Sequence, residues 1–186
     1  SAGKPIGNGI IKIYDEQGKV CAPLQTGKIY VHQPAYADFT YKNNPDARKK
    51  IERDGLITLG DLGYLDEDGF LFVCDRESDM VISGGVNIYP AEIENELLTH
   101  PEIADCAVIG IPDEEYGEKL IAFVQLTPGQ TQPSGERLIE WLKPKIAGYK
   151  IPREFRFQTE LPRDDSGKIV KRKLRQPFWE KSLRKV

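Results

Sequence analysis

The alternation of hydrophobic and polar positions predicts a β-rich structure for the first 76 residues. Short alternating runs at residues 9–14 and 27–32 are each bounded by turn residues, and residues 65–73 have the pattern of a hairpin with an acidic tip. One helix is predicted here, over residues 45–54, because proline suits a first helical turn and the glycine that follows is a typical stop.

From residue 77 onwards, the pattern becomes mixed. The predicted elements are strands at 80–83 and 86–89, a helix at 90–98, strands at 103–111 and 119–126, a helix after an N-cap at Ser134, a strand at 155–157 and a helix at 170–183. The order ββαββαβα is typical of a compact α+β domain with its own core. We therefore expect two parts, residues 1–76, a β-rich end piece of a larger domain, and residues 77–186, a small α+β domain.

The composition is that of a globular protein, with 39% hydrophobic and 30% charged residues. The formal net charge of −3 provides no overall positive field for nucleic acid or an anionic membrane. No run approaches the roughly 18 apolar residues of a transmembrane segment. The three cysteines and two histidines form no zinc or disulfide pattern. We expect free thiols and a cytoplasmic location.

The beginning of the chain does not resemble a natural N-terminus. Residues 1–9 contain no initiating methionine, and they lack the apolar core and cleavage pattern of a signal peptide. They are rich in glycine and proline, like the interior of a loop. The expectation is that the chain was cut from a longer protein.

Two groups of residues could carry chemistry. In the first, a Ser-Gly turn precedes Lys168 and would project its ammonium group from a loop, where it suits a carboxylate or a phosphate. In the second, Asp61 follows a glycine and could accept both hydroxyls of a ribose, with Arg76 reinforcing that contact. A plain surface turn and a structural salt bridge are the respective alternatives.

Together and in order, three motifs resemble the adenylate-forming enzymes: acyl- and aryl-CoA synthetases, firefly-type luciferases and the adenylation domains of nonribosomal peptide synthetases. The motifs are Gly-Asp at 60–61, Asp-Arg…Ser-Gly-Gly…Asn-Ile-Tyr-Pro-Ala-Glu-Ile-Glu at 75–94, and Pro…Gly-Lys at 162–168. The resemblance covers essentially the whole chain. The sequence of residues 75–94 is most similar to that of fatty-acid and related acyl-CoA ligases.

The resemblance implies a first step in which a carboxylate and ATP form acyl-AMP and pyrophosphate. Lys168 matches the lysine that bridges the carboxylate and the α-phosphate, where its charge would stabilise the transition state. Asp61 and Arg76 match the residues that hold the ribose of ATP. The protein ligand of the accompanying Mg²⁺, the phosphate loop and the acyl pocket would lie upstream of this sequence, which would leave this piece inactive alone.

The resemblance also implies a second step, in which the C-terminal domain rotates about a hinge at Ser78 and a thiol attacks the acyl-AMP. Many relatives have Lys or Asp at the hinge. Gly84 and Gly85 match the turn that lines the pantetheine tunnel. A weaker resemblance places three residues at the nucleotide end of CoA, with an aromatic ring on the adenine and two cations near phosphates. These residues are Tyr149, Lys150 and Arg153.

Three alternatives stay open from the sequence. The acceptor could be the phosphopantetheine of a carrier protein, and the domain could be a CoA- or nucleotide-binding module without catalysis. Acetylation of Lys168 by a protein acetyltransferase would remove its charge and silence the enzyme. The basic C-terminal segment is interpreted as an amphipathic helix rather than a nucleic-acid arm. Its cations are Lys168, Lys171, Arg172, Lys173, Arg175, Lys181, Arg184 and Lys185.

Overall fold

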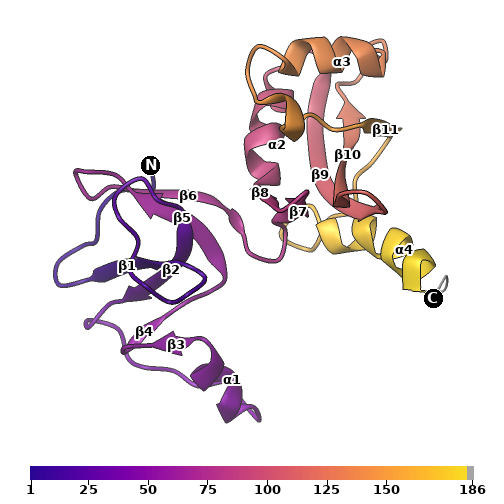
Figure 1. Ribbon diagram of the computed structural model, residues 1–186. Helices are drawn as coiled ribbons and strands as arrows, with labels where there is room; N and C mark the ends of the chain where they lie inside the picture. The colour runs from indigo at the N-terminus through magenta and orange to yellow at the C-terminus, as the bar shows by residue number, and fades with distance from the viewer. Residues whose placement is uncertain (184–186) are drawn as a thin grey trace. The chain divides into compact units, whose positions relative to one another are not determined.

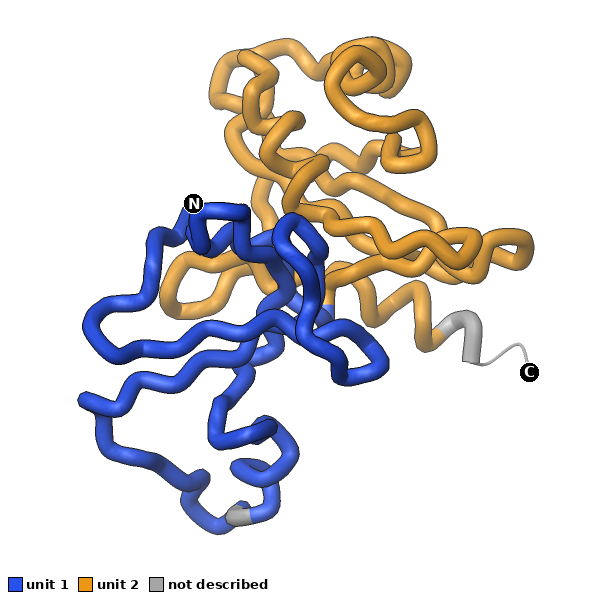
Figure 2. The backbone as a smooth tube through the Cα atoms, turned by 60° about the vertical axis from the view of Figure 1, so that its left-hand side comes forward, with its two compact units in different colours: residues 1–78 blue, residues 79–186 orange. Residues whose placement is uncertain are grey.

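The computed structural model describes residues 1–183, and the chain divides into two compact units, residues 1–78 and 79–186 (Figure 2). The hydropathy pattern changes at residues 76/77, two residues before this division. Each unit has its own sheet and its own hydrophobic clusters. Arg184 and Lys185 of the predicted basic segment, and the side chain of Lys181, lie outside what the structure describes.

The first unit is built on a six-stranded antiparallel sheet (Figure 1). Its strands are β1 (Ile10–Tyr14), β2 (Gly27–His32), β3 (Glu52–Arg53), β4 (Leu56–Ile57), β5 (Asp61–Leu65) and β6 (Leu71–Arg76). Strand β2 pairs with β1, β4 and β5, and β6 extends the sheet from β5. Alternate apolar positions of β1, β2 and β6 form one hydrophobic cluster, with Ile13, Ile29 and Leu71 buried at its centre.

The predicted helix at residues 45–54 is wrong at its C-terminal end. Helix α1 covers Pro45–Lys50, and the next residues form the short hairpin of β3 and β4. Asp54 and Gly55 at the hairpin turn both have positive φ, 52° and 75°. An Asp-Gly pair between strands is the typical sequence of this kind of turn, and that local preference overrides continuation of the helix.

The second unit has the predicted mixed order, and the predicted α+β class is confirmed. Its elements are β7 (Val81–Ser83), β8 (Val86–Ile88), α2 (Pro90–Leu98), β9 (Ile103–Asp113), β10 (Gly117–Leu126), α3 (Gly135–Leu142), a 3₁₀ turn (Gly148–Lys150), β11 (Glu154–Gln158) and α4 (Lys171–Leu183). Strand β10 is antiparallel to β9 and parallel to β11. The β7–β8 hairpin joins the start of β10.

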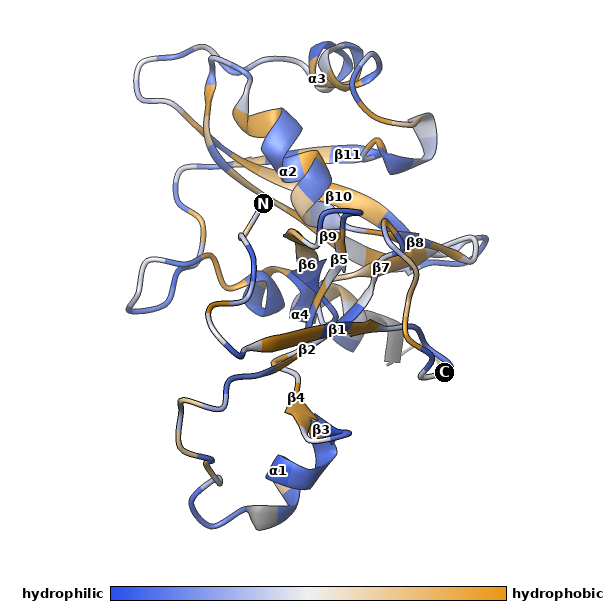
Figure 3. Ribbon diagram, turned by 90° about the vertical axis from the view of Figure 1, so that its left-hand side faces the viewer, coloured by the Kyte–Doolittle hydropathy of each residue, from blue (hydrophilic) through white to orange (hydrophobic). Residues whose placement is uncertain are grey.

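Helices cover both faces of this sheet. Because side chains alternate along a strand, Cys106 and Val108 pack in the cluster that contains α2 and α3, while Ala107 and Ile109 pack in the cluster that contains α4. Strand β9 is therefore buried without interruption from Cys106 to Ile111. Figure 3 shows the matching apolar colouring along β9 and β10. The second unit is a three-layer structure with β9 in its middle layer.

Within residues 1–183, no helix is both long enough and apolar enough to cross a bilayer. The same range contains no group of three or more His, Cys, Asp or Glu side chains arranged to hold a metal ion. All three cysteines are free thiols. Cys106 is the buried one, and burial raises the pKa of its thiol well above the ordinary value.

Adjacent leucines on α2 provide a matched test of this core. Leu97 is fully buried, whereas Leu98 is 44% exposed. Leu97→Ala should lower the free energy of unfolding by about 2–5 kcal/mol, because it leaves a cavity in the core, and Leu98→Ala should change it by no more than about 0.5 kcal/mol. Denaturant unfolding followed by tryptophan fluorescence reports on this unit, because Trp141 and Trp179 both lie in it. Equal destabilisation by the two substitutions would contradict the packing of α2.

Candidate functional site

Two of the predicted residues meet at one end of the first unit. Asp61 begins β5, Arg76 ends β6, and the two are directly opposed in the register of the sheet. Arg76 Nε lies 3.6 Å from Asp61 Oδ1, and both side chains are exposed. An exposed pair at this distance adds little to stability. The carboxylate therefore keeps acceptor sites for other groups, such as the two hydroxyls of a diol.

Ser78 lies in the turn that follows β6, at the border between the two units. The residue before it is held from two sides. Glu77 N donates to Gly60 O at 2.8 Å, and the Glu77 carboxylate pairs with Lys28 Nζ at 2.6 Å. The backbone of the first unit is thus fixed up to the residue that precedes Ser78.

Lys168 lies in the loop between β11 and α4, where a carboxylate fixes the backbone. Asp164 Oδ1 accepts hydrogen bonds from Ser166 N at 2.9 Å, Ser166 Oγ at 2.7 Å and Lys168 N at 3.1 Å. The bonds from Ser166 and Lys168 hold the pKa of Asp164 below its usual value. Gly167 has a φ of +84°, which glycine adopts at low cost. The loop therefore has a fixed backbone at Lys168 and an exposed lysine side chain.

Both ends of this loop are attached to the core of the second unit. Val170 N donates to Pro162 O at 2.7 Å and closes the loop at its base. Leu161 beside it is 1% exposed and packs in the cluster that contains β9 and α4. The first residue of α4, Lys171, places its Nζ 2.8 Å from Glu94 Oε1 on α2. The same Glu94 oxygen accepts Val108 N of β9 at 2.6 Å, so one carboxylate connects two helices and a strand.

The turn between β7 and β8 consists of the two predicted glycines. Gly84 and Gly85 have φ values of +57° and +78°, the conformation that a tight hairpin turn requires at both central positions. Gly84 N donates to Tyr116 O at 2.8 Å, which ties this turn to the β9–β10 connection. A Cβ atom on Gly84 would lie 3.3 Å from Cδ1 of the Tyr116 ring. A side chain at residue 84 would thus be strained and crowded.

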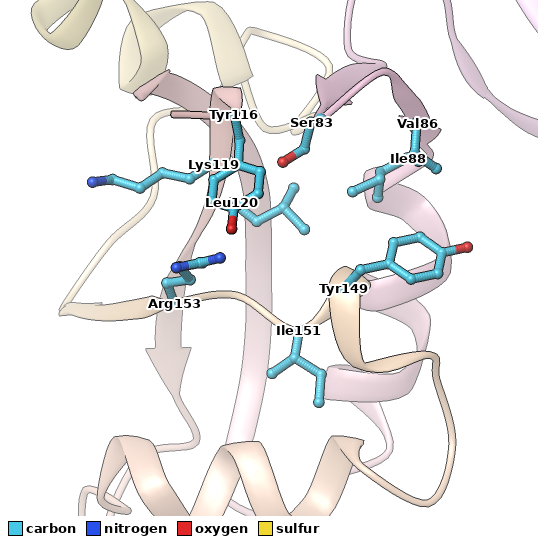
Figure 4. A pocket seen from close by; sticks show the side chains of 10 residues that line it. Ser83, Val86, Ile88, Tyr116, Lys119, Leu120, Tyr149, Ile151 and Arg153 are labelled. Atoms are coloured by element: carbon cyan, nitrogen blue, oxygen red, sulfur yellow. The ribbon is translucent and has the colours of Figure 1, made fainter. Parts of the chain in front are cut away.

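A pocket of about 230 Å³ lies between this turn, the β9–β10 connection and the segment after α3. Three predicted residues line it, namely Gly84, Tyr149 and Arg153. The Arg153 guanidinium carbon lies 5.0 Å from the centre of the Tyr116 ring, and Tyr149 stands across the pocket from them (Figure 4). Tyr149 is 59% exposed, so a face of its ring is accessible. The other lining residues are Ser83, Val86, Ile88, Tyr116, Lys119, Leu120 and Ile151.

Gly85 and Lys150 are not among the residues that line this pocket. The Lys150 ammonium pairs with Glu92 of α2 at 2.7 Å and 2.8 Å. Lys119 lines the pocket instead, but its side chain points away from the pocket (Figure 4), and its Nζ lies 3.3 Å from Asp113. Tyr116 and Lys119 were not predicted from the sequence as pocket residues. They lie beside a glycine that follows an acidic run, and this pattern predicts a hairpin turn rather than a ligand-binding site.

Comparison with known proteins identifies relatives of this chain. Residues 92–168 match the family described as the AMP-binding enzyme C-terminal domain. The fatty acid–[acyl-carrier-protein] ligase ScoC of Streptomyces coeruleorubidus is 42% identical over the whole chain, which covers 36% of that protein. The 2-succinylbenzoate–CoA ligase of Bacillus cereus is 43% identical over 95% of the chain, again 36% of the relative.

Solved structures give the same result. The o-succinylbenzoate CoA synthetase MenE of Bacillus subtilis, in complex with the acyl-adenylate intermediate OSB-AMP, has a TM-score of 0.87 and 41% identity, over 94% of this chain and 35% of that one. The amide bond synthetase McbA of Marinactinospora thermotolerans has a TM-score of 0.86 and 30% identity, over 95% of this chain and 36% of that one. The chain thus spans about a third of the length of the relatives it matches. Residues 92–168 are thus identified as an AMP-binding enzyme C-terminal domain, and the relatives that the chain matches over nearly its whole length are acyl- and aryl-CoA ligases of the adenylate-forming superfamily and related enzymes.

Proposed function

We propose that this chain is the C-terminal part of an ATP-dependent acid–thiol ligase. A carboxylate oxygen attacks the α-phosphorus of ATP, and pyrophosphate leaves. A thiol then attacks the acyl carbon of the acyl-AMP, its proton is released, and AMP leaves. The observation that carries this proposal is the loop of Lys168, whose backbone is fixed by Asp164 while its ammonium group stays exposed.

In the first step, Lys168 is the residue that bridges the carboxylate and the α-phosphate. Its positive charge lies where negative charge accumulates in the transition state, and a preorganised charge of this kind is worth several kcal/mol. Asp61 and Arg76 hold the ribose of ATP, since their exposed, opposed side chains present acceptors and a donor side by side. Mg²⁺ enters with ATP as the partner of its phosphates.

In the second step, the pocket beside Gly84 receives the thiol substrate. The glycine turn leaves room for a slender chain such as pantetheine to pass the backbone. Tyr149 offers a ring face to adenine, and Arg153 offers positive charge to phosphates. Lys150 contributes indirectly, because its pair with Glu92 holds the segment that carries Tyr149 against α2.

A carrier-protein phosphopantetheine is the second candidate acceptor, because the relative ScoC is an acyl-carrier-protein ligase. The two acceptors share the pantetheine arm, but the carrier protein lacks the adenosine of CoA. The exposed ring of Tyr149, across the pocket from Arg153, favours free CoA, since the ring would have no adenine to stack on if the acceptor were a carrier protein. The acid is proposed to be a fatty or an aryl carboxylate, the classes on which the named relatives act.

Two further expectations stay predictions. A cytoplasmic location is supported by three cysteines that are all free thiols. Acetylation of Lys168 requires an accessible amine, and this side chain is exposed on its loop. A non-catalytic binding module is the opposing hypothesis, and it requires CoA or a nucleotide to bind without turnover by the enzyme that contains this chain.

Substitution of Lys168 tests the first step. In the enzyme that contains this chain, Lys168→Ala should slow acyl-AMP formation about 10²- to 10³-fold, because it removes the charge that stabilises the transition state. Pyrophosphate exchange across a panel of fatty and aryl acids measures this step. Thioester formation from supplied acyl-AMP should stay within about threefold of wild type. An unchanged exchange rate, or equal loss in both steps, would exclude the proposed role.

Substitution of Arg153 tests the second step. Arg153→Ala should raise the KM for CoA about tenfold or more, because it removes a charged hydrogen-bond donor to phosphate, and it should leave pyrophosphate exchange unchanged. Arg156→Ala is the matched control, since it removes an arginine three positions further along, paired with Glu154 at 2.6 Å and outside the pocket. Wild-type KM for CoA in the Arg153 variant, with turnover on a carrier protein, would favour the second candidate.

A further inference from the structure

The loop of Lys168 is fastened to β9 by a single guanidinium group. Arg163 Nη1 donates to Gly167 O at 2.8 Å, which is the carbonyl immediately before Lys168. The other terminal nitrogen of Arg163 pairs with the carboxylate of Asp105 on β9. One side chain therefore joins the backbone beside the proposed catalytic lysine to a strand of the middle layer of the unit.

Asp105 is a firm attachment point. It pairs with Gln125 of β10 in the sheet register, and its Oδ1 accepts the backbone N–H of Cys106 at 2.9 Å. Cys106 begins the part of β9 that is buried on both faces. The second carboxylate oxygen, Oδ2, receives Arg163. Arginine is suited to this bridge because its planar group presents donors to two acceptors at once, whereas a lysine ammonium is a single point charge.

The contacts within the loop do not replace this bridge. The three hydrogen bonds to Asp164 fix the shape of the turn from Asp164 to Lys168, but they lie wholly inside it. The base of the loop is held at Pro162 and Val170. Between base and tip, Ile169 packs against the cluster that contains β9 and α4, and Arg163 provides the polar contact to β9. Loss of the Arg163 side chain would leave the turn intact and anchored through Ile169, but without its polar attachment to β9.

We infer that Arg163, held by Asp105, is a positioning residue for the first half-reaction. Arg163 fixes the position of the Lys168 backbone relative to β9. The position of the backbone in turn limits where the Lys168 ammonium group can reach. This inference rests on the proposed role of Lys168. The pair is partly exposed, so its contribution to folding stability is small. Its contribution to rate is larger, because a displacement of about 1 Å at a reacting group can cost on the order of 10²-fold.

The experiment measures pyrophosphate exchange in the enzyme that contains this chain. Arg163→Ala should slow exchange about 10- to 100-fold, while Arg163→Lys and Asp105→Asn should each lose less, because each keeps part of the bridge. Thioester formation from supplied acyl-AMP should be unchanged in all three variants. Arg137→Ala is the matched control, since it removes an arginine of the same unit whose Nη1 pairs with Glu102 at 2.9 Å. That control should keep the wild-type exchange rate.

A double variant separates positioning from general damage. Because Arg163 acts through Lys168, Arg163→Ala combined with Lys168→Ala should exchange no more slowly than Lys168→Ala alone. Additive losses, or a wild-type exchange rate in both Arg163→Ala and Asp105→Asn, would overturn the inference. A wild-type rate in Lys168→Ala would instead overturn the proposed function of that lysine. If Arg163→Ala does not fold, Arg163→Lys and Asp105→Asn carry the same comparison.

Discussion

The burial of β9 on both faces is the constraint on which the second unit depends. A strand with apolar side chains on both sides must be covered on both sides, and here α2 and α3 cover one face while α4 covers the other. That requirement fixes where α4 begins, and the loop of Lys168 immediately precedes α4. The proposed catalytic lysine is thus exposed on a loop whose two ends are held by the hydrophobic core. Polar contacts within and beside the loop then fix the position of the lysine backbone.

Much of this arrangement could be predicted from the sequence. The strand and helix order of the second unit followed from periodicity, because its elements are long and strongly patterned. The end of α1 was not recognised, although the sequence holds two signals for it, the Asp54-Gly55 pair of a hairpin turn and the three basic residues 48–50 in the last helical turn. Asp61 and Arg76 are separated in sequence and opposed in space, and it is the pairing of β5 with β6 that brings them together.

The residues that line the pocket could be predicted from the sequence only in part. Gly84, Tyr149 and Arg153 were expected near the thiol substrate, and they line one pocket. Lys150 was expected beside them, but its ammonium is paired with Glu92. The sequence does not show which carboxylate the lysine beside Tyr149 will pair with, because that pairing depends on how α2 packs. Tyr116 and Lys119 enter the pocket for the same reason, since the position of one hairpin against another is a tertiary property.

The carboxylate of Glu94 has a consequence for how the two steps are ordered. It joins α2, which directly follows β8 and the glycine turn, to Lys171, which lies three residues after Lys168. The edge proposed to serve the thiol and the edge proposed to serve the adenylate therefore belong to one compact unit and are linked through Glu94. Any motion that brings one edge to the substrate carries the other with it. The order of the two proposed reactions would then follow from which edge of the unit faces the bound substrate.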